Sequence, residues 1–210
     1  MNSLGAERIE NSDFLHHEFP VPVYCQIGPQ SYTKHKSGQA FDFRHFAFFP
    51  DEYNSEFLPF TRSADMLITA HFWNPASPRM ISKEDMQLPG FRIKVIADIS
   101  CDVDGPIAST LRATTIEEPF YDYDPFEEIE KPAFSSTRNI TVMAVDNLPA
   151  ELPGDSSQSF GETLIQHVFP EIAGVSNTGL IEKATIVNHG EIVPRFSYLR
   201  DWIGKNAGSD

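Results

Sequence analysis

The chain has 210 residues, a formal net charge of −14 and 40% hydrophobic residues, and it contains 17 phenylalanines. This much apolar and aromatic surface predicts a folded protein of one domain or two small ones, and excludes a disordered chain. The negative charge argues against nonspecific binding to nucleic acid or to an anionic membrane. No apolar run approaches the roughly 18 residues of a membrane span.

The first sixty residues carry only weak signals of structure. Residues 1–20 are polar and are expected to be loosely ordered. An apolar run predicts a strand over 21–27, and a polar loop follows over 28–38. A second apolar run predicts a strand over 45–49, and the Pro-Asp pair after it predicts a short helix over 52–60.

Three apolar, β-branched runs predict buried strands, over residues 65–72, 91–100 and 140–145. Such runs are typical of strands covered on both faces of a parallel sheet. Between the first two, Ser82 resembles a helix N-cap with an acidic first turn, which predicts a helix over 83–88.

The remaining segments are more polar. Residues 117–131 are acidic and contain several prolines, so they are expected to form an ordered loop. The strongest helical periodicity covers 160–172, after a loop over 149–159. A hairpin or a helix-to-loop step is expected over 181–196, and a closing turn of helix over 198–203.

Strand, connection and strand thus recur three times, which favours an α/β fold with a mostly parallel sheet. Three strands are few for such a sheet. Either the N-terminal segments add strands, or the chain is one part of a larger protein.

Polar groups follow each predicted strand, at His71–Asn74, Ser100–Asp104 and Asp146–Asn147. The carboxyl ends of adjacent parallel strands meet at one edge, where ligands bind in open α/β sheets. These groups therefore indicate a nucleotide or substrate cleft. The alternative is ordinary turn chemistry, since Asp, Asn and Ser are common turn residues.

Other candidate chemistry is weaker. Asp102 and Asp104 could form a carboxylate or metal pair, but carboxylates at this spacing are more often solvated or capping groups. Cys101 has no basic partner in sequence, so nucleophilic catalysis is not predicted. Cys25 and Cys101 have no CxxC spacing. No metal site is predicted, and the polar N-terminus, which lacks a signal-peptide core, favours the cytoplasm.

Several colinear motifs resemble the lysine-forming saccharopine dehydrogenases and lysine–ketoglutarate reductases. This group belongs to the wider alanine dehydrogenase and pyridine nucleotide transhydrogenase superfamily. The match runs from about residue 46 to 199. The motifs are Met66–Trp73, Pro78–Met80, Ala97–Asp102, Gly105–Ile107, Thr114–Tyr121 and Val145–Pro153.

The resemblance implies a three-layer Rossmann-type domain, present here in part, that binds NAD or NADP beside a substrate domain. It implies hydride transfer at a C–N bond, interconverting saccharopine with lysine and 2-oxoglutarate. The cofactor contacts implied are Ala70, Val145, Asp146, Asn147 and Leu148, and the substrate contacts are His71, Phe72 and Trp73.

The departures from the family pattern are equally informative. The glycine-rich phosphate turn, the acidic residue that holds the ribose, and the catalytic lysine and histidine have no counterpart in this sequence. Lys34 and His35 lie in no matching motif, so no catalytic residue is assigned. We expect a C-terminal half: a loose segment over 1–20, half of a Rossmann-type domain over 21–175, and a tail over 176–210.

Alone, such a half should bind dinucleotide weakly, because the phosphate-binding helix N-terminus is missing, and should be inactive. Its exposed strand edge predicts a homodimer. Two alternatives stay open: an alanine-dehydrogenase-like enzyme, and a non-catalytic module that binds or regulates a partner.

Overall fold

A computed structural model describes residues 5–200 and 203. The chain forms two compact units that meet in sequence between Leu148 and Pro149. Each unit is described by itself. The domain boundaries expected at 20/21 and 175/176 stay predictions, and part of the helical turn expected over 198–203 lies outside the described residues.

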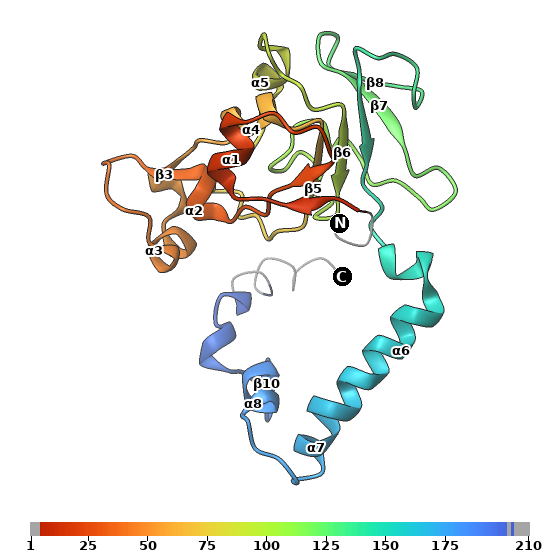
Figure 1. Ribbon diagram of the computed structural model, residues 1–210. Coiled ribbons are helices and arrows are strands. Elements are labelled where there is room, and N and C mark those ends of the chain that lie inside the picture. The colour runs from red at the N-terminus through yellow and green to blue at the C-terminus, as the bar shows by residue number, and fades with distance from the viewer. Residues whose placement is uncertain (1–4, 201–202, 204–210) are drawn as a thin grey trace. The chain divides into compact units, whose positions relative to one another are not determined.

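The centre of the first unit is a five-stranded sheet (Figure 1). Its strands, in spatial order, are β5 (Met66–Thr69), β6 (Val95–Asp98), β9 (Ile140–Met143), β7 (Tyr121–Asp124) and β8 (Ile129–Lys131). The first three run parallel, and β7 is antiparallel to both β9 and β8. The predicted α/β class with a mostly parallel, Rossmann-type sheet is confirmed.

The parallel strands are buried mainly on one face. Ile96, Ile140 and Val142 are at most 1% exposed, whereas Met66 and Ile68 on the edge strand are 50% and 44% exposed. The expectation of burial on both faces was therefore wrong. The apolar run indicated strand identity correctly, but the alternation of side chains leaves one row of the edge strand open to solvent.

The hairpin β7–β8 replaces the loop expected over 117–131. Tyr121 and Tyr123 point into the core at 1% and 0% exposure. Acidic residues alternate with these tyrosines, so the composition of the segment did not indicate a buried strand. The Asp124 carboxylate accepts hydrogen bonds from the backbone N–H groups of Phe126 and Glu127, which builds the turn.

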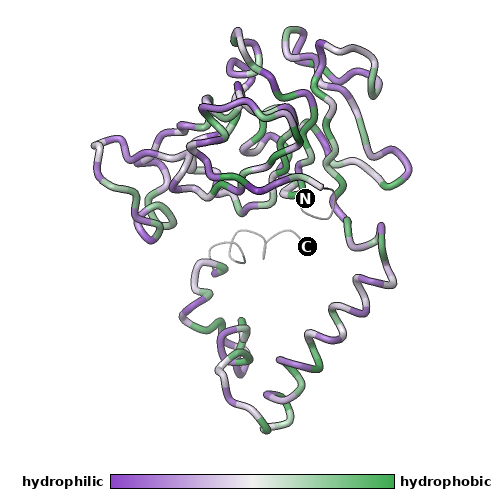
Figure 2. The backbone as a smooth tube through the Cα atoms, viewed as in Figure 1, coloured by the Kyte–Doolittle hydropathy of each residue, from purple (hydrophilic) through white to green (hydrophobic). Residues whose placement is uncertain are grey.

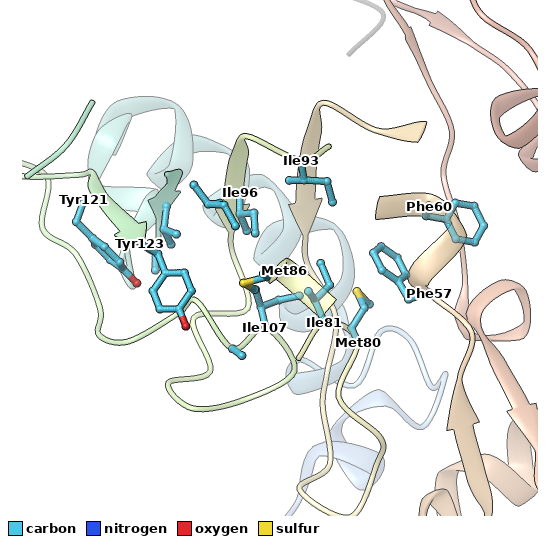
Figure 3. Close-up of a cluster of buried hydrophobic side chains, with 14 residues drawn as sticks. Phe57, Phe60, Met80, Ile81, Met86, Ile93, Ile96, Ile107, Tyr121 and Tyr123 are labelled. Atoms are coloured by element: carbon cyan, nitrogen blue, oxygen red, sulfur yellow. The ribbon is translucent and has the colours of Figure 1, made fainter. Parts of the chain in front are cut away.

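A single core lies beside the sheet (Figure 3). Its rings and aliphatic chains come from the strands, from α4 (Leu58–Ser63) and α5 (Lys83–Gln87), and from the intervening loops. The predicted helix at α5 is confirmed, with a reciprocal capping box between Ser82 and Asp85. The labelled core residues are Phe57, Phe60, Met80, Ile81, Met86, Ile93, Ile96, Ile107, Tyr121 and Tyr123.

The N-terminal segment, expected to be loose, contains paired strands and short helices. Strand β1 (Glu7–Arg8) pairs parallel with β2 (Val23–Tyr24), which lies inside the strand predicted over 21–27. Helix α1 (Asn11–His16) connects them in sequence. Helix α2 (Pro29–Tyr32) and the whole of the next strand, residues 33–35, fall within the loop expected over 28–38.

Two further expectations near the N-terminus were wrong. The run over 45–49 belongs to helix α3 (Phe43–Phe48), because the Asp42 side chain accepts a hydrogen bond from the His45 N–H at 2.7 Å and caps the helix. The helix expected over 52–60 is split into η2 (Pro50–Glu52), β4 (Tyr53–Ser55) and α4. Pairing of β4 with β3 (Thr33–His35) overrides the local signal.

The second unit is mostly helical. After η3 (Leu148–Glu151), a helix runs through α6 (Pro153–Thr163), a π-helical turn η4 (Leu164–Val168) and α7 (Phe169–Ile172). The helix thus starts at Pro153, earlier than the predicted residue 160, because proline at a first helical position and an acidic first turn favour a start there.

Beyond Gly174, the second unit continues with short elements. They are α8 (Leu180–Ala184), the hairpin β10 (Val187–Asn188) and β11 (Glu191–Ile192), and η5 (Pro194–Phe196). The hairpin around His189-Gly190 is confirmed. Over the residues described, none of the helices has both the length and the apolar character that a bilayer crossing requires.

Candidate site at the carboxyl ends of the parallel strands

The three predicted polar strand ends meet at one rim of the sheet. The His71 backbone N–H, after β5, donates to Ser100 Oγ, after β6, at 3.0 Å. The Cys101 thiol then donates to the Ala144 carbonyl, after β9, at 3.1 Å. The convergence expected from parallel neighbours is present, since side chains after β6 contact the backbone at the ends of both β5 and β9.

A buried carboxylate organises this rim. Asp98, at the end of β6, is 0% exposed. Its two oxygens accept hydrogen bonds from the hydroxyls of Thr69 and Thr110, each at 2.6 Å, and from the Cys101 N–H at 3.2 Å. Such charge-assisted bonds are the stronger kind, and they tie β5, β6 and the following loop together.

His71 lies half-buried beside this carboxylate. Burial lowers the pKa of its imidazole, and the nearby charges of Asp98 and Asp102 oppose that shift without cancelling it. Ser100 Oγ lies 3.4 Å from Nδ1. The imidazole is therefore neutral at neutral pH and able to donate or accept a hydrogen bond at the rim.

Cys101 does not have the character of a nucleophile. Burial raises the pKa of its thiol, and the negative charges of Asp98, Asp146 and Asp102 raise it further. Its backbone has a φ of 52°, so it forms part of a tight turn. The prediction that Cys101 is not a nucleophile agrees with this acidic surrounding, because the thiolate is disfavoured there.

The turn after β6 has a defined shape. The Gly105 N–H donates to the Asp102 carbonyl at 2.9 Å, and a Cβ on Gly105 would lie 2.5 Å from that same oxygen. Asp104 forms an ion pair with Arg79 at 2.7 Å, which lowers the pKa of the carboxyl. Asp104 is thus occupied by Arg79 and does not join Asp102 in a carboxylate pair.

The predicted substrate residues differ in exposure. Phe72 is 91% exposed, whereas Trp73 is half-buried. Among the described residues, the Trp73 indole Nε1 is buried and meets no hydrogen-bond acceptor. An unpaired buried donor costs roughly 1–3 kcal/mol, so this atom is a natural contact for a ligand with an acceptor oxygen.

The predicted cofactor residues occupy the outer rim. Ala70, Asp146 and Asn147 are exposed and Leu148 is half-buried. Val145 is 3% exposed and forms an isolated bridge with Thr114. Val145 is thus fixed in the fold and anchors the exposed Asp146 and Asn147 that follow it.

A cleft of about 960 Å³ runs along the edge strand and reaches this rim. Ala70 and His71 line one part of it, and residues 14–27 line another. Ser100 lies in one of the predicted strand ends, whereas Asp98 and Thr110 were not predicted as parts of the site. A lone aspartate within an apolar strand was the available signal, because a buried charge requires partners.

The chain is similar to several known proteins, and it matches only a small part of the length of each. The chain is 28% identical over 186 residues to an alpha-aminoadipic semialdehyde synthase of Arabidopsis thaliana, covering 83% of this chain and 17% of that protein. It is 27% identical to the mitochondrial alpha-aminoadipic semialdehyde synthase of Bos taurus, covering 72% and 19%. The chain is related to one part of these enzymes.

A further relative is the NAD⁺-dependent, L-lysine-forming saccharopine dehydrogenase of Schizosaccharomyces pombe, at 27% identity over 51% of this chain and 28% of that protein. No family model matches the chain. These names confirm the predicted resemblance to saccharopine dehydrogenases, and the wider superfamily stays a prediction. The chain spans less than a third of the length of each of these three relatives.

Proposed function

We propose that the chain is the C-terminal part of a dinucleotide-dependent oxidoreductase that acts on the C–N bond of an amino acid of the saccharopine type. The relatives support the oxidoreductase class and the lysine-related chemistry, and they do not support the alanine-dehydrogenase alternative. The observation that carries the proposal is the shared rim at the carboxyl ends of β5, β6 and β9.

The proposed cofactor is NAD or NADP, which supplies hydride transfer when bound. The residues at the rim fit such a group. Asp146 and Asn147 are exposed and offer oxygens that can accept hydrogen bonds from ribose hydroxyls, and the exposed Ala70 leaves room at the neighbouring strand end. Val145 and Leu148 would hold this pair in place.

The substrate side of the proposal rests on His71, Phe72 and Trp73. The neutral imidazole and the unpaired indole N–H are donors that suit a carboxylate oxygen of an amino-acid substrate. The exposed Phe72 ring offers an apolar surface beside them. Asp98 would position this segment through Thr69 without touching the ligand.

The test is a titration of the chain with NADH, and separately with NADPH, followed by amide chemical-shift changes in NMR spectra. Weak binding, in the millimolar range, is expected because the sequence lacks a glycine-rich phosphate turn. Shifts should concentrate at residues 70–73, 98–104 and 144–148.

The matched variants are Asn147→Ala at the rim and Gln158→Ala on exposed α6. The first should weaken the shifts at least about threefold and the second should leave them unchanged. Absence of rim shifts at saturating dinucleotide would contradict the proposal and favour a non-catalytic module. Parallel titrations with lysine, 2-oxoglutarate and saccharopine identify the substrate class.

A reducing compartment, such as the cytoplasm, is part of the proposal, because Cys25 and Cys101 are free thiols. Alkylation of the protein in lysate, without prior reduction, should label both cysteines if this is correct.

A further inference from the structure

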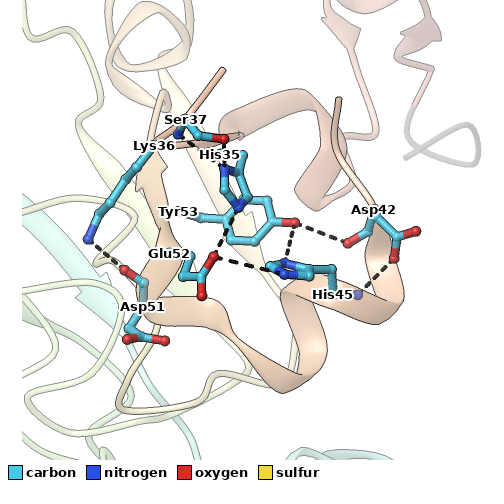
Figure 4. A network of polar contacts seen from close by, with 8 residues as sticks. All are labelled: His35, Lys36, Ser37, Asp42, His45, Asp51, Glu52 and Tyr53. Atoms are coloured by element: carbon cyan, nitrogen blue, oxygen red, sulfur yellow. Dashed lines mark hydrogen bonds and ion pairs between the residues drawn. The ribbon is translucent and has the colours of Figure 1, made fainter. Parts of the chain in front are cut away.

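Three potential metal ligands meet at a second place in the first unit, between β3, α3 and β4 (Figure 4). His35 ends β3, His45 lies in α3, and Glu52 precedes β4. Glu52 Oε2 is 3.2 Å from His35 Nε2 and 3.9 Å from His45 Nε2. One donor atom from each residue lies within 4.8 Å of the others.

These separations are close to those of a zinc site. Zinc binds imidazole nitrogen and carboxylate oxygen at about 2.0–2.2 Å in tetrahedral geometry, so its donor atoms stand roughly 3.4 Å apart. The two distances to Glu52 bracket this value. The Glu52 side chain is half-exposed, at 50%, so its carboxylate has room to shift toward an ion held by the histidines.

The His45 ring is held in the orientation that a ligand needs. Tyr53 Oη donates to the Asp42 carbonyl at 3.3 Å, so the same oxygen is available to accept a hydrogen bond from His45 Nδ1, which lies 3.2 Å away. In the tautomer with the proton on Nδ1, the Nε2 lone pair is available to a metal ion, and Nε2 lies 3.9 Å from Glu52 Oε2.

His35 requires one adjustment. Its Nδ1 accepts the backbone N–H of Ser37 at 3.1 Å and lies 2.8 Å from Ser37 Oγ, so Nε2 carries the proton that points to Glu52. On metal binding the proton must move to Nδ1, where Ser37 Oγ can accept a hydrogen bond from it. The Ser37 backbone N–H, which lies in an exposed turn, then has to give up its hydrogen bond to Nδ1.

We propose that His35, His45 and Glu52 bind a zinc ion, with a fourth position open to water. No metal site was predicted at these residues, because they share no sequence motif and are brought together only by the fold. Three protein ligands with a solvent position match the ligand count of open zinc sites. The ion would join β3, α3 and β4, at the side of the unit away from β7 and β8 (Figure 1).

The test is zinc binding to the untagged full chain, measured by isothermal titration calorimetry after chelator treatment. One equivalent should bind, and Co²⁺ in its place should give visible absorption bands of tetrahedral or five-coordinate type. His45→Ala and Glu52→Gln should each weaken zinc binding by about a hundredfold or more. Tyr53→Phe should weaken it about tenfold, as expected for loss of an outer-shell partner.

Control variants separate this site from adventitious binding. His16→Ala/His17→Ala removes two exposed histidines outside the cluster, and Asp51→Ala removes the carboxylate next to Glu52, and neither should change the affinity. Circular dichroism of the metal-free variants verifies that each one is folded. Binding that persists in His45→Ala and Glu52→Gln but falls in His16→Ala/His17→Ala would overturn the proposal, as would zinc affinity no tighter than millimolar in the unmodified chain.

Discussion

The two units of this chain differ in what their apolar residues do. In the first unit, aliphatic and aromatic side chains from sheet, helices and loops form one buried cluster. In the second unit, none of the described residues is buried, and Phe160, Ile165 and Ile172 are 66%, 66% and 67% exposed. Figure 2 shows apolar positions recurring along the helix of the second unit.

Hydrophobic periodicity and burial are therefore separate properties of a helix. The pattern over α6 to α7 specifies an amphipathic helix, but the stability of a helix in water comes mainly from packing its apolar face. The first unit has its own core and the described part of the second unit does not. Substitutions of the same type should therefore have unequal effects in the two units.

The largest difference is expected for buried charge. Asp98→Ala leaves two buried threonine hydroxyls without their acceptor, at a cost of about 1–3 kcal/mol each, and should lower the free energy of unfolding by about 3–5 kcal/mol. Asp155→Ala, in the first turn of exposed α6, should cost at most about 1 kcal/mol through the helix dipole. Urea unfolding followed by circular dichroism measures both values, and equal costs would contradict the comparison.

A matched isoleucine pair tests apolar packing. Ile107→Ala, at 0% exposure, should destabilise the protein by about 2–5 kcal/mol through lost burial and a cavity. Ile165→Ala, at 66% exposure, should change stability by less than about 0.5 kcal/mol. If the second substitution unfolds the helix of the second unit in circular dichroism, that helix has a packing partner in solution.

These contrasts also explain how far the sequence could predict the structure. The strands at 65–72, 91–100 and 140–145 were found because their cores are continuous apolar runs, and the rim followed from their parallel order. The strand β7 was missed because Asp122 and Asp124 alternate with tyrosines, which made the segment look solvated. A prediction from composition treats an aspartate as a polar, solvent-exposed residue, whereas this fold surrounds the aspartate with hydrogen-bond donors.

The helix α3 was missed for the opposite reason. Its Phe-rich run has the composition of a strand. The hydrogen bond from the His45 N–H to the Asp42 side chain caps a helix there, and composition does not reveal it. The rim could be located from strand ends, but Asp98 and its partners depend on contacts between segments far apart in sequence. The cluster of His35, His45 and Glu52 likewise exists only in three dimensions.

Asp122 links the stability of the first unit to pH. The carboxylate is 0% exposed and accepts hydrogen bonds from Thr141 Oγ1 at 2.8 Å, the Ser135 N–H at 2.8 Å and the Phe134 N–H at 3.0 Å. Burial alone would raise the pKa of this carboxyl, but the hydrogen bonds together outweigh burial, and the pKa is lowered. The ionised form is therefore stabilised by folding.

The lowered pKa sets the sign of the pH dependence of stability. A carboxyl whose pKa is lower in the folded state stabilises the protein fully above its unfolded pKa of about 3.9, and the contribution is lost as the pH falls through the folded pKa. Asp122→Asn should cost about 1–3 kcal/mol at pH 7. The difference in free energy of unfolding between the variant and the unmodified protein, measured by urea titration, should become smaller below pH 4. A difference that stays constant to pH 2 would contradict the lowered pKa of Asp122.

The smallest expected effect concerns the edge strand of the first unit. One side of β5 pairs with β6, and Met66 and Ile68 present exposed side chains beside the outer backbone edge. Such edges favour pairing between copies, which is the basis of the predicted homodimer, and a charged side chain opposes it. Met66→Lys should weaken dimerisation about tenfold, which corresponds to about 1.4 kcal/mol. Sedimentation velocity at several micromolar concentrations measures the change, with Val175→Lys, exposed in the second unit, as control. If the unmodified chain is a monomer at every concentration tested, the predicted homodimer is wrong. The apolar edge of β5 then has no second copy as a partner and borders only the cleft that residues 14–27 also line.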